Sequence, residues 1–192
     1  RKAIAELKEA APEFLDGRGR HTKVLLVPFG TEVERAPLAP AAAAAQSVDD
    51  LQPDDDSVEI AMADALRAAL IELNRQRPPG GGPAPRRLIV LVSDGLNARM
   101  DRATFRALGD EARESGVPIH AIAFSPIDER GPLLNLGELS KRSNGTFRWA
   151  REAGELGAQF ASLAQEIDRQ SVLDFESRVS SLSEHTFNLG CG

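Results

Sequence analysis

The residues best suited to chemistry are Ser93, Asp94 and Gly95, which directly follow the apolar run LIVLV at residues 88–92. A run rich in β-branched residues is typical of a strand buried on both faces, as in a parallel sheet. Ligands of open α/β sheets bind beyond the carboxyl ends of the strands. Asp94 is therefore a candidate metal or hydroxyl ligand, and Gly95 permits the tight turn that presents it. The alternative is that Asp94 caps the following helix, and these residues alone leave both roles open.

A second polar cluster, DDDS at residues 54–57, precedes a helix predicted over residues 58–73. Acidic residues and a serine at a helix start complement its positive end and cap its free amides. Helix capping is therefore the favoured interpretation of the aspartates over metal binding.

Residues suited to covalent catalysis are scarce. The chain has no Gly-x-Ser-x-Gly elbow and no phosphate-binding loop, because the glycines in the linker at residues 77–85 precede a strand instead of following one. The three histidines, His21, His120 and His185, form no Ser/His/Asp set with Asp94. We interpret His120 as a packed or surface histidine. The sequence predicts no enzyme, and an α/β hydrolase or phosphotransferase using Asp94 is the less favoured alternative.

Composition limits the class of protein further. The 192 residues predict one domain of ordinary size, and a net charge of −6 argues against a general nucleic-acid binder. The single cysteine, Cys191, excludes an internal disulfide framework and a cysteine-built zinc site. No run is long enough to cross a bilayer, so we expect no membrane insertion by this chain. The chain begins at Arg1 instead of Met, and we expect it to be processed or excised from a longer protein.

Helices and strands are predicted from the spacing of apolar residues. Helical spacing predicts helices over residues 1–16, 58–73, 101–115, 132–142 and 155–169. Apolar runs predict buried strands over residues 23–29, 88–92, 117–124 and 146–150, with 32–38 as a returning edge strand. Pro12 suggests a kink or an early end of the first helix. We expect the alanines at 41–45 to form at most a helical turn, and 46–56 to be an acidic loop.

Strands that alternate with amphipathic helices predict an α/β fold, a doubly wound and mostly parallel sheet with helices on both faces. We expect residues 1–170 to form this domain. Residues 171–192 are expected to be a short C-terminal β extension, with strands at 172–176 and 185–189, or the start of a linker to another segment.

In this order the segments resemble a bacterial-type von Willebrand factor A (VWA) domain over nearly the whole chain, to about residue 170. The resemblance rests on KVLLVPFG, ALRAAL, RLIVLVSDG, VPIHAIAF and GTFRWA followed by a helix. It implies a Rossmann-like VWA fold, in which a metal-ion-dependent adhesion site binds partners, usually proteins, through a divalent cation. The family builds that site from an Asp-x-Ser-x-Ser loop, a threonine before a later helix, and an aspartate after the fourth strand.

The family's site residues carry over only in part. Asp94 matches the aspartate after the fourth strand, and Ser57 is the hydroxyl nearest to the threonine position in residues 54–60. The resemblance thus implies Asp94 and Ser57 as metal ligands. The Asp-x-Ser-x-Ser loop is not found, because the helix that follows it in the family begins at Arg1. We expect the family's first strand and its loop to lie upstream of this chain.

The function implied by the resemblance is a non-enzymatic protein interaction or cell adhesion module. It would bind an acidic group of a partner through Mg²⁺ or another divalent cation. Mg²⁺ prefers octahedral oxygen coordination, so two protein oxygens suffice only for loose binding, and the cation is conditional on upstream residues. The alternative is a metal-independent structural or regulatory domain of a larger bacterial envelope or secretion protein. The sequence does not determine the compartment, and we expect the bacterial cell envelope or the extracellular space, as part of a larger protein.

Overall fold

The computed structural model describes residues 2–52, 61–76, 85–94, 100–125, 130–152 and 154–170. The predicted β extension at 171–192, Ser57 and Gly95 lie outside these ranges, and so does most of the linker at 77–85. The described elements in chain order are α1 (Lys2–Asp16), β1 (Lys23–Val24), β2 (Ala39–Pro40), α2 (Ala41–Asp49), α3 (Met62–Arg75), β3 (Ile89–Ser93), α4 (Arg102–Glu114), β4 (Ile119–Phe124), α5 (Arg130–Arg142), β5 (Phe147–Ala150) and α6 (Glu155–Arg169).

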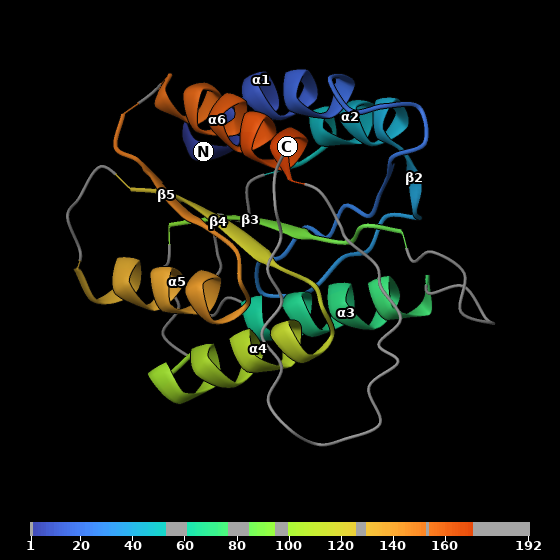
Figure 1. The fold of residues 1–192 in the computed structure, drawn as a ribbon. Helices are drawn as coiled ribbons and strands as arrows, with labels where there is room; N and C mark the ends of the chain where they lie inside the picture. Colours follow the sequence, from blue (N-terminus) through green and yellow to red (C-terminus); the bar gives the residue numbers. More distant parts are fainter. Residues whose placement is uncertain are drawn as a thin grey trace, which may run out of the picture.

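The elements form three layers, with the strands between two layers of helices (Figure 1). Helices α1, α2 and α6 cover one face, while α3, α4 and α5 cover the other. The strands β3, β4 and β5 form a parallel sheet in that order. The predicted α/β fold with helices on both faces is confirmed.

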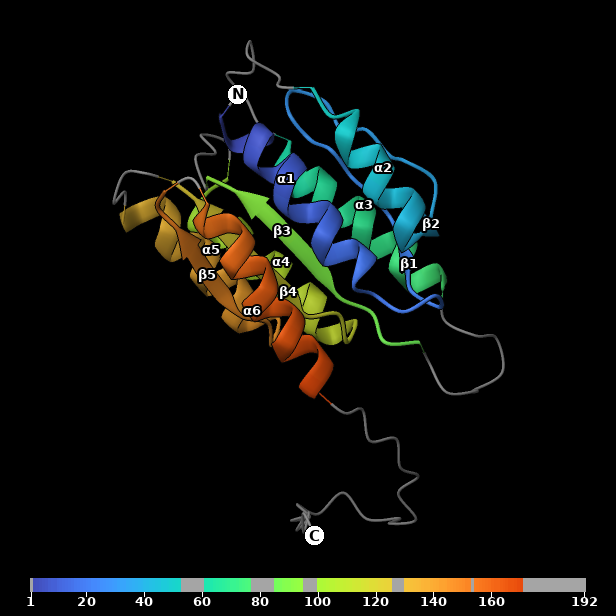
Figure 2. The ribbon, with the colours of Figure 1, turned by 90° about the horizontal axis from the view of Figure 1, so that it is seen from above.

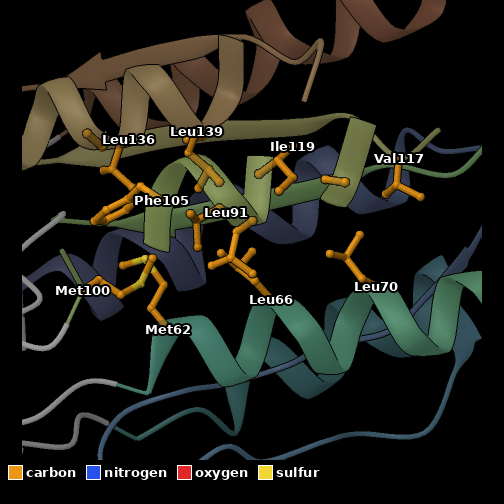
Figure 3. Packing of buried hydrophobic residues seen from close by; sticks show 14 of the residues in the cluster. Met62, Leu66, Leu70, Leu91, Met100, Phe105, Val117, Ile119, Leu136 and Leu139 are labelled. Carbon is orange, nitrogen blue, oxygen red and sulfur yellow. The ribbon is translucent and has the colours of Figure 1, made fainter. Parts of the chain in front are cut away.

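The centre of the core is β4, in which every residue is buried. Its side chains alternate between the two helical layers, as the period of a strand requires. Ile119, Ala121 and Ala123 pack with α3, α4 and α5, whereas Ile122 and Phe124 pack with α1, α2 and α6. Figure 3 shows the first of these clusters, in which Leu66 and Leu70 of α3 approach the sheet from below.

Strand β3 is less buried than predicted. Only Leu91 is buried among its five residues, and the other four, such as Ile89 and Val90, are half-buried. The expectation of a strand buried on both faces is therefore wrong in its extent. The reason is pairing, because within the described part of the chain β3 has a single partner strand, β4.

A hairpin over residues 23–40 lies on the side of β3 away from β4 (Figure 2). β1 pairs antiparallel with β2, and Phe29 forms a bridge with Val33. The Ala36 N–H donates to the Leu26 carbonyl at 3.0 Å. The predicted antiparallel return is thus present, but the regular strands are only β1 and β2, and residues 24–30 are half-buried instead of buried.

α1 matches its predicted range, whereas α2 is longer than the predicted helical turn. α1 continues through Pro12 to Asp16, so an early end, one of the two effects suggested for Pro12, does not occur, because packing against α2 and α6 outweighs the lost hydrogen bond. α2 extends to Asp49, so the predicted acidic loop at 46–56 is wrong over its first residues. Ala44, Ala45 and Val48 are buried on the face of α2 that packs with α1, and this contact extends the helix.

The other helices and strands match their predicted ranges within a few residues. α3 begins at Met62, and the predicted start of this helix at 58–60 lies outside the described residues. No helix in the described ranges is long and apolar enough to cross a membrane.

Candidate functional site

The candidate site is the carboxyl edge of the parallel sheet. Asp94 follows β3 and Ser125 follows β4, while Arg151 follows β5, so all three residues leave the sheet at this edge. Ser93 pairs with Ala123, which places Asp94 one residue beyond the paired part of β3. The predicted location of Asp94 is therefore confirmed.

Asp94 is exposed, and it is not the cap of the helix that follows β3. That helix, α4, is capped by Asp101, whose carboxylate accepts hydrogen bonds from the Thr104 N–H and hydroxyl, both at 2.7 Å. These hydrogen bonds lower the pKa of Asp101. The alternative in which Asp94 caps the helix is wrong, because a different aspartate, seven residues further along the chain, occupies the cap position.

The start of α3 also reaches this edge. The Ala61 N–H donates to the carbonyl of Gly30 at 2.8 Å, which joins the start of α3 to the turn of the hairpin. Figure 3 shows Met62 beside Met100, and both side chains belong to the buried cluster between α3 and α4. Met62, at the start of α3, and Met100, shortly before α4, thus lie side by side.

A complete metal centre is not present among the described residues. In those ranges no three His, Cys, Asp or Glu side chains are gathered as a metal would require. Ser57, the second predicted ligand, lies outside them. The described part of the site thus supplies one candidate ligand, Asp94, which fits a hard divalent cation by its carboxylate chemistry but does not complete a coordination shell.

An arginine stacked on a tryptophan forms a second feature of the edge. The guanidinium of Arg151 lies 4.0 Å from the ring centroid of Trp149, and the Trp149 indole N–H donates to the Ser125 carbonyl at 3.0 Å. The Arg151 N–H donates to the Glu155 carboxylate at 2.6 Å. The sequence alone did not identify this pair. A separation of two residues puts Trp149 and Arg151 on one face of an extended chain, but this spacing does not predict that the two side chains stack.

The first turns of α1 contribute a buried charge-bearing side chain. Glu6 is 8% exposed, and both of its carboxylate oxygens are buried with no hydrogen-bond partner among the described residues. Buried polar atoms nearly always have a partner, so this carboxylate lies in an incomplete environment.

The histidines lie away from Asp94. His120 is buried near the amino end of β4, and its Nδ1 is hydrogen-bonded to the hydroxyl of Thr146 at 2.9 Å. Burial lowers the pKa of this imidazole. Of the two predicted alternatives, a packed or a surface histidine, His120 is the packed one. His21 is exposed just before β1, and His185 lies outside the described residues.

No protein-family model and no curated protein matches this chain. Among solved structures, an aerotolerance-related membrane protein from Bacteroides fragilis is similar, with a TM-score of 0.65 and 17% identity over 87% of this chain and 89% of that one. BatB from Bacteroides thetaiotaomicron has a TM-score of 0.65 and 16% identity over 86% of this chain and 87% of its own. Proximal thread matrix protein 1 of the mussel byssus, with a zinc-occupied MIDAS motif, has a TM-score of 0.61 and 17% identity over 85% of this chain and 42% of its own.

The fold is a Rossmann-like VWA fold. The TM-scores of 0.65 show that the fold is shared, and at identities of 16% and 17% the similarity shows nothing beyond the fold. The function of this VWA-like chain therefore has to be argued from its own residues.

Proposed function

We propose that this chain is a non-enzymatic protein interaction module that binds its partner at the carboxyl edge of the sheet through a divalent cation on Asp94. The observation that carries the proposal is Asp94 itself. It is exposed at the end of β3 in a VWA fold, and Asp101 occupies the helix cap that would otherwise explain it. An open coordination position on the cation would accept an acidic side chain of the partner.

Two further observations support the cation. The structurally similar mussel matrix protein has a zinc-occupied MIDAS motif, and carboxylate and hydroxyl oxygens suit Mg²⁺ equally well. Ser57 precedes Ala61 by four residues, a chain length of at most about 14 Å. Because Ala61 is bonded to Gly30 at the same edge, Ser57 is our second proposed ligand.

We also propose that a further strand fills the space between β3 and the hairpin. The Ile89 N–H is bonded toward β4, so strand alternation directs the backbone groups of Val90 and Val92 away from β4. On the hairpin, the Leu26 carbonyl accepts within the hairpin, so the groups of Leu25 point outward. No backbone hydrogen bond between described residues joins these two edges. Open, half-buried edges of this kind call for a pairing strand.

The proposed strand would run parallel to β3 and lead into α1. α1 begins at the carboxyl edge, where the chain's N-terminal end lies beside the end of β3 (Figure 2). A parallel strand followed by α1 and then β1 forms a βαβ unit. Its carboxyl end would bring the remaining cation ligands beside Asp94, and the residues that precede α1 would supply hydrogen-bond donors to the buried Glu6 carboxylate.

A metal-independent structural or regulatory role in a larger bacterial envelope or secretion protein is the second candidate. It is favoured by the single candidate ligand in the described part of the edge. The similar B. fragilis structure is a membrane protein, which supports an envelope or extracellular location for this chain. Catalysis is not proposed, because His120 is buried near the opposite edge and offers no base to Asp94.

The test is the response of the natural full-length protein to Mg²⁺ and to a chelator. Saturating Mg²⁺ should raise Tm, because a ligand at 100 times its Kd stabilises the native state by about 2.7 kcal/mol. Asp94→Asn should abolish this rise, while Asp49→Asn, an exposed carboxylate at the end of α2, should preserve it. If neither Mg²⁺ nor chelator changes the Tm of the wild type, the cation proposal is overturned and the metal-independent role is retained.

A further inference from the structure

We propose that Arg151 is a second anion contact at the carboxyl edge and that the partner is an acidic peptide segment carrying two carboxylates. One carboxylate would occupy an open coordination position of the cation bound to Asp94, and the other would pair with the guanidinium of Arg151. The inference rests on the proposed function, since it names the chemistry of the partner that the same edge binds.

The first argument is preorganisation. The Arg151 guanidinium is held over the Trp149 ring at 4.0 Å, and Trp149 is fixed in turn by its hydrogen bond to the Ser125 carbonyl. The backbone of Arg151 is anchored by the Glu155 carboxylate. A stacked guanidinium presents a planar set of donors and loses little conformational freedom on binding a carboxylate. Arginine and tryptophan are also the residue types that most often dominate binding energy at protein interfaces.

The second argument is the contrast with the other stacked arginine, Arg18. Arg18 lies 5.0 Å from the ring of Phe14, and its guanidinium also forms an ion pair with Asp168 at 2.9 Å. Its charge is therefore used within the fold. The Arg151 guanidinium has no ion pair and donates no side-chain hydrogen bond to any described residue. The Oε2 atom of Glu155 accepts from the backbone N–H groups of Arg151 and Glu152 and not from the Arg151 guanidinium.

The third argument is spacing. Asp94 directly follows β3 and Arg151 directly follows β5, and β4 lies between these strands, with Ser93 and Trp149 both paired to Ala123. Neighbouring strands are about 4.8 Å apart, which separates the two backbones by roughly 10 Å. A peptide spans at most about 3.3 Å per residue, so two glutamates whose flexible side chains reach the same edge need a separation of at least about three residues to cover this distance. This spacing distinguishes the proposed ligand from a single free carboxylate.

The experiment measures binding of the labelled, end-capped peptide Glu-Ala-Ala-Glu to the natural full-length protein by fluorescence anisotropy at low salt with Mg²⁺. We expect Arg151→Gln to raise Kd roughly twofold to fivefold, the upper part of the range for an exposed ion pair. Arg151→Lys should give an intermediate value, since it keeps the charge but not the planar stack. Arg169→Gln is the matched control, because Arg169 is exposed in the last turn of α6 at the opposite edge.

Trp149 provides a second readout, since it is the only tryptophan of the 192 residues. In this chain the acidic peptide should change the Trp149 emission, whereas Gln-Ala-Ala-Gln should not. The inference is overturned if Arg151→Gln binds like wild type, or if the two peptides bind equally. If Kd changes with chelator but not with Arg151→Gln, the Arg151 contact is overturned and the proposed cation site is retained. Dependence on Arg151 without dependence on chelator supports Arg151 and removes the cation.

Discussion

Strands β3 and β4 have similar apolar sequences, IVLVS and IHAIAF, yet they differ in how deeply their side chains are buried. β4 has a parallel partner on each side and helices on both faces, and all of its residues are buried. β3 has helices on both faces but one partner strand in the described chain, and four of its five residues are half-buried. Apolar character thus sets where a strand belongs, while its neighbours set how deeply it is buried.

The same contrast bears on function. The residue after β4, Ser125, is buried, whereas the residue after β3, Asp94, is exposed, and within the described chain β3 pairs on one side only. A binding site needs accessible side chains on a rigid framework, and the buried strand β4 is the central strand of that framework.

The largest expected effect is at the tight contact between β4 and the turn before β5. A Cβ added at Gly145 would lie 2.0 Å from the backbone oxygen of Ile119, which cannot move without disrupting β4. We expect Gly145→Ala to destabilise the protein by at least about 3 kcal/mol in chemical denaturation. Gly131→Ala is the control, because nothing lies within 4 Å of its added Cβ, and it should be neutral or slightly stabilising. Equal effects of the two substitutions would contradict this account.

A matched pair of isoleucines compares the two strands directly. Ile122 of β4 is fully buried, and Ile89 of β3 is half-buried. We expect Ile122→Ala to lower the free energy of unfolding of this chain by about 3 to 4 kcal/mol and Ile89→Ala by about 1 to 2 kcal/mol. In the natural full-length protein the proposed strand should bring the two costs closer together. An unchanged difference there would argue that the edge of β3 stays open.

Hydrogen exchange tests the open edge at single residues. In this chain the amides of Val90 and Val92, which point away from β4, should exchange faster than that of Leu91, which points toward it. In the natural full-length protein all three amides should be protected, because the proposed strand would accept the outward hydrogen bonds. Fast exchange of Val90 in both proteins would exclude that strand.

The smallest expected effect concerns the buried polar residue of β4. Burial holds the pKa of His120 below its ordinary value of 6.5, so below pH 6.5 the unfolded state binds more protons than the native state. The stability from neutral His120 is therefore present above pH 6.5 and is lost as pH falls through the folded pKa. Tm of the wild type should fall more between pH 7.5 and 5.0 than Tm of His120→Asn. If Tm falls equally with pH in the wild type and in His120→Asn, burial in β4 does not lower the pKa of His120.

The order of helices and strands was predictable because the local spacing of apolar residues indicates each element. The spacing of apolar residues located α4, β4 and α6 to within about two residues. This spacing did not predict the helix extent where distant contacts determine it, as at Pro12 and along α2. There the packing of α1 against α2 stabilises both helices. Ser57 and the β extension at 171–192 lie outside the described residues and stay predictions.

The candidate site was predictable in its position more than in its chemistry. Asp94 could be placed because the end of an apolar run in an α/β pattern marks the carboxyl edge. The pairing of Arg151 with Trp149 depended on rotamers and on the carbonyl of Ser125, which no spacing in the sequence encodes.

By itself, the sequence determined the α/β layers, the succession of elements and the edge at which Asp94 emerges, since hydrophobic period and turn residues act over short stretches of chain. Only the tertiary structure decided that Arg18 pairs with Asp168, that Arg151 has no ion pair with any described residue, and that in the described chain β3 has one partner strand where β4 has two. Those outcomes depend on which distant residues come into contact, and burial, pairing and charge compensation are properties of such contacts.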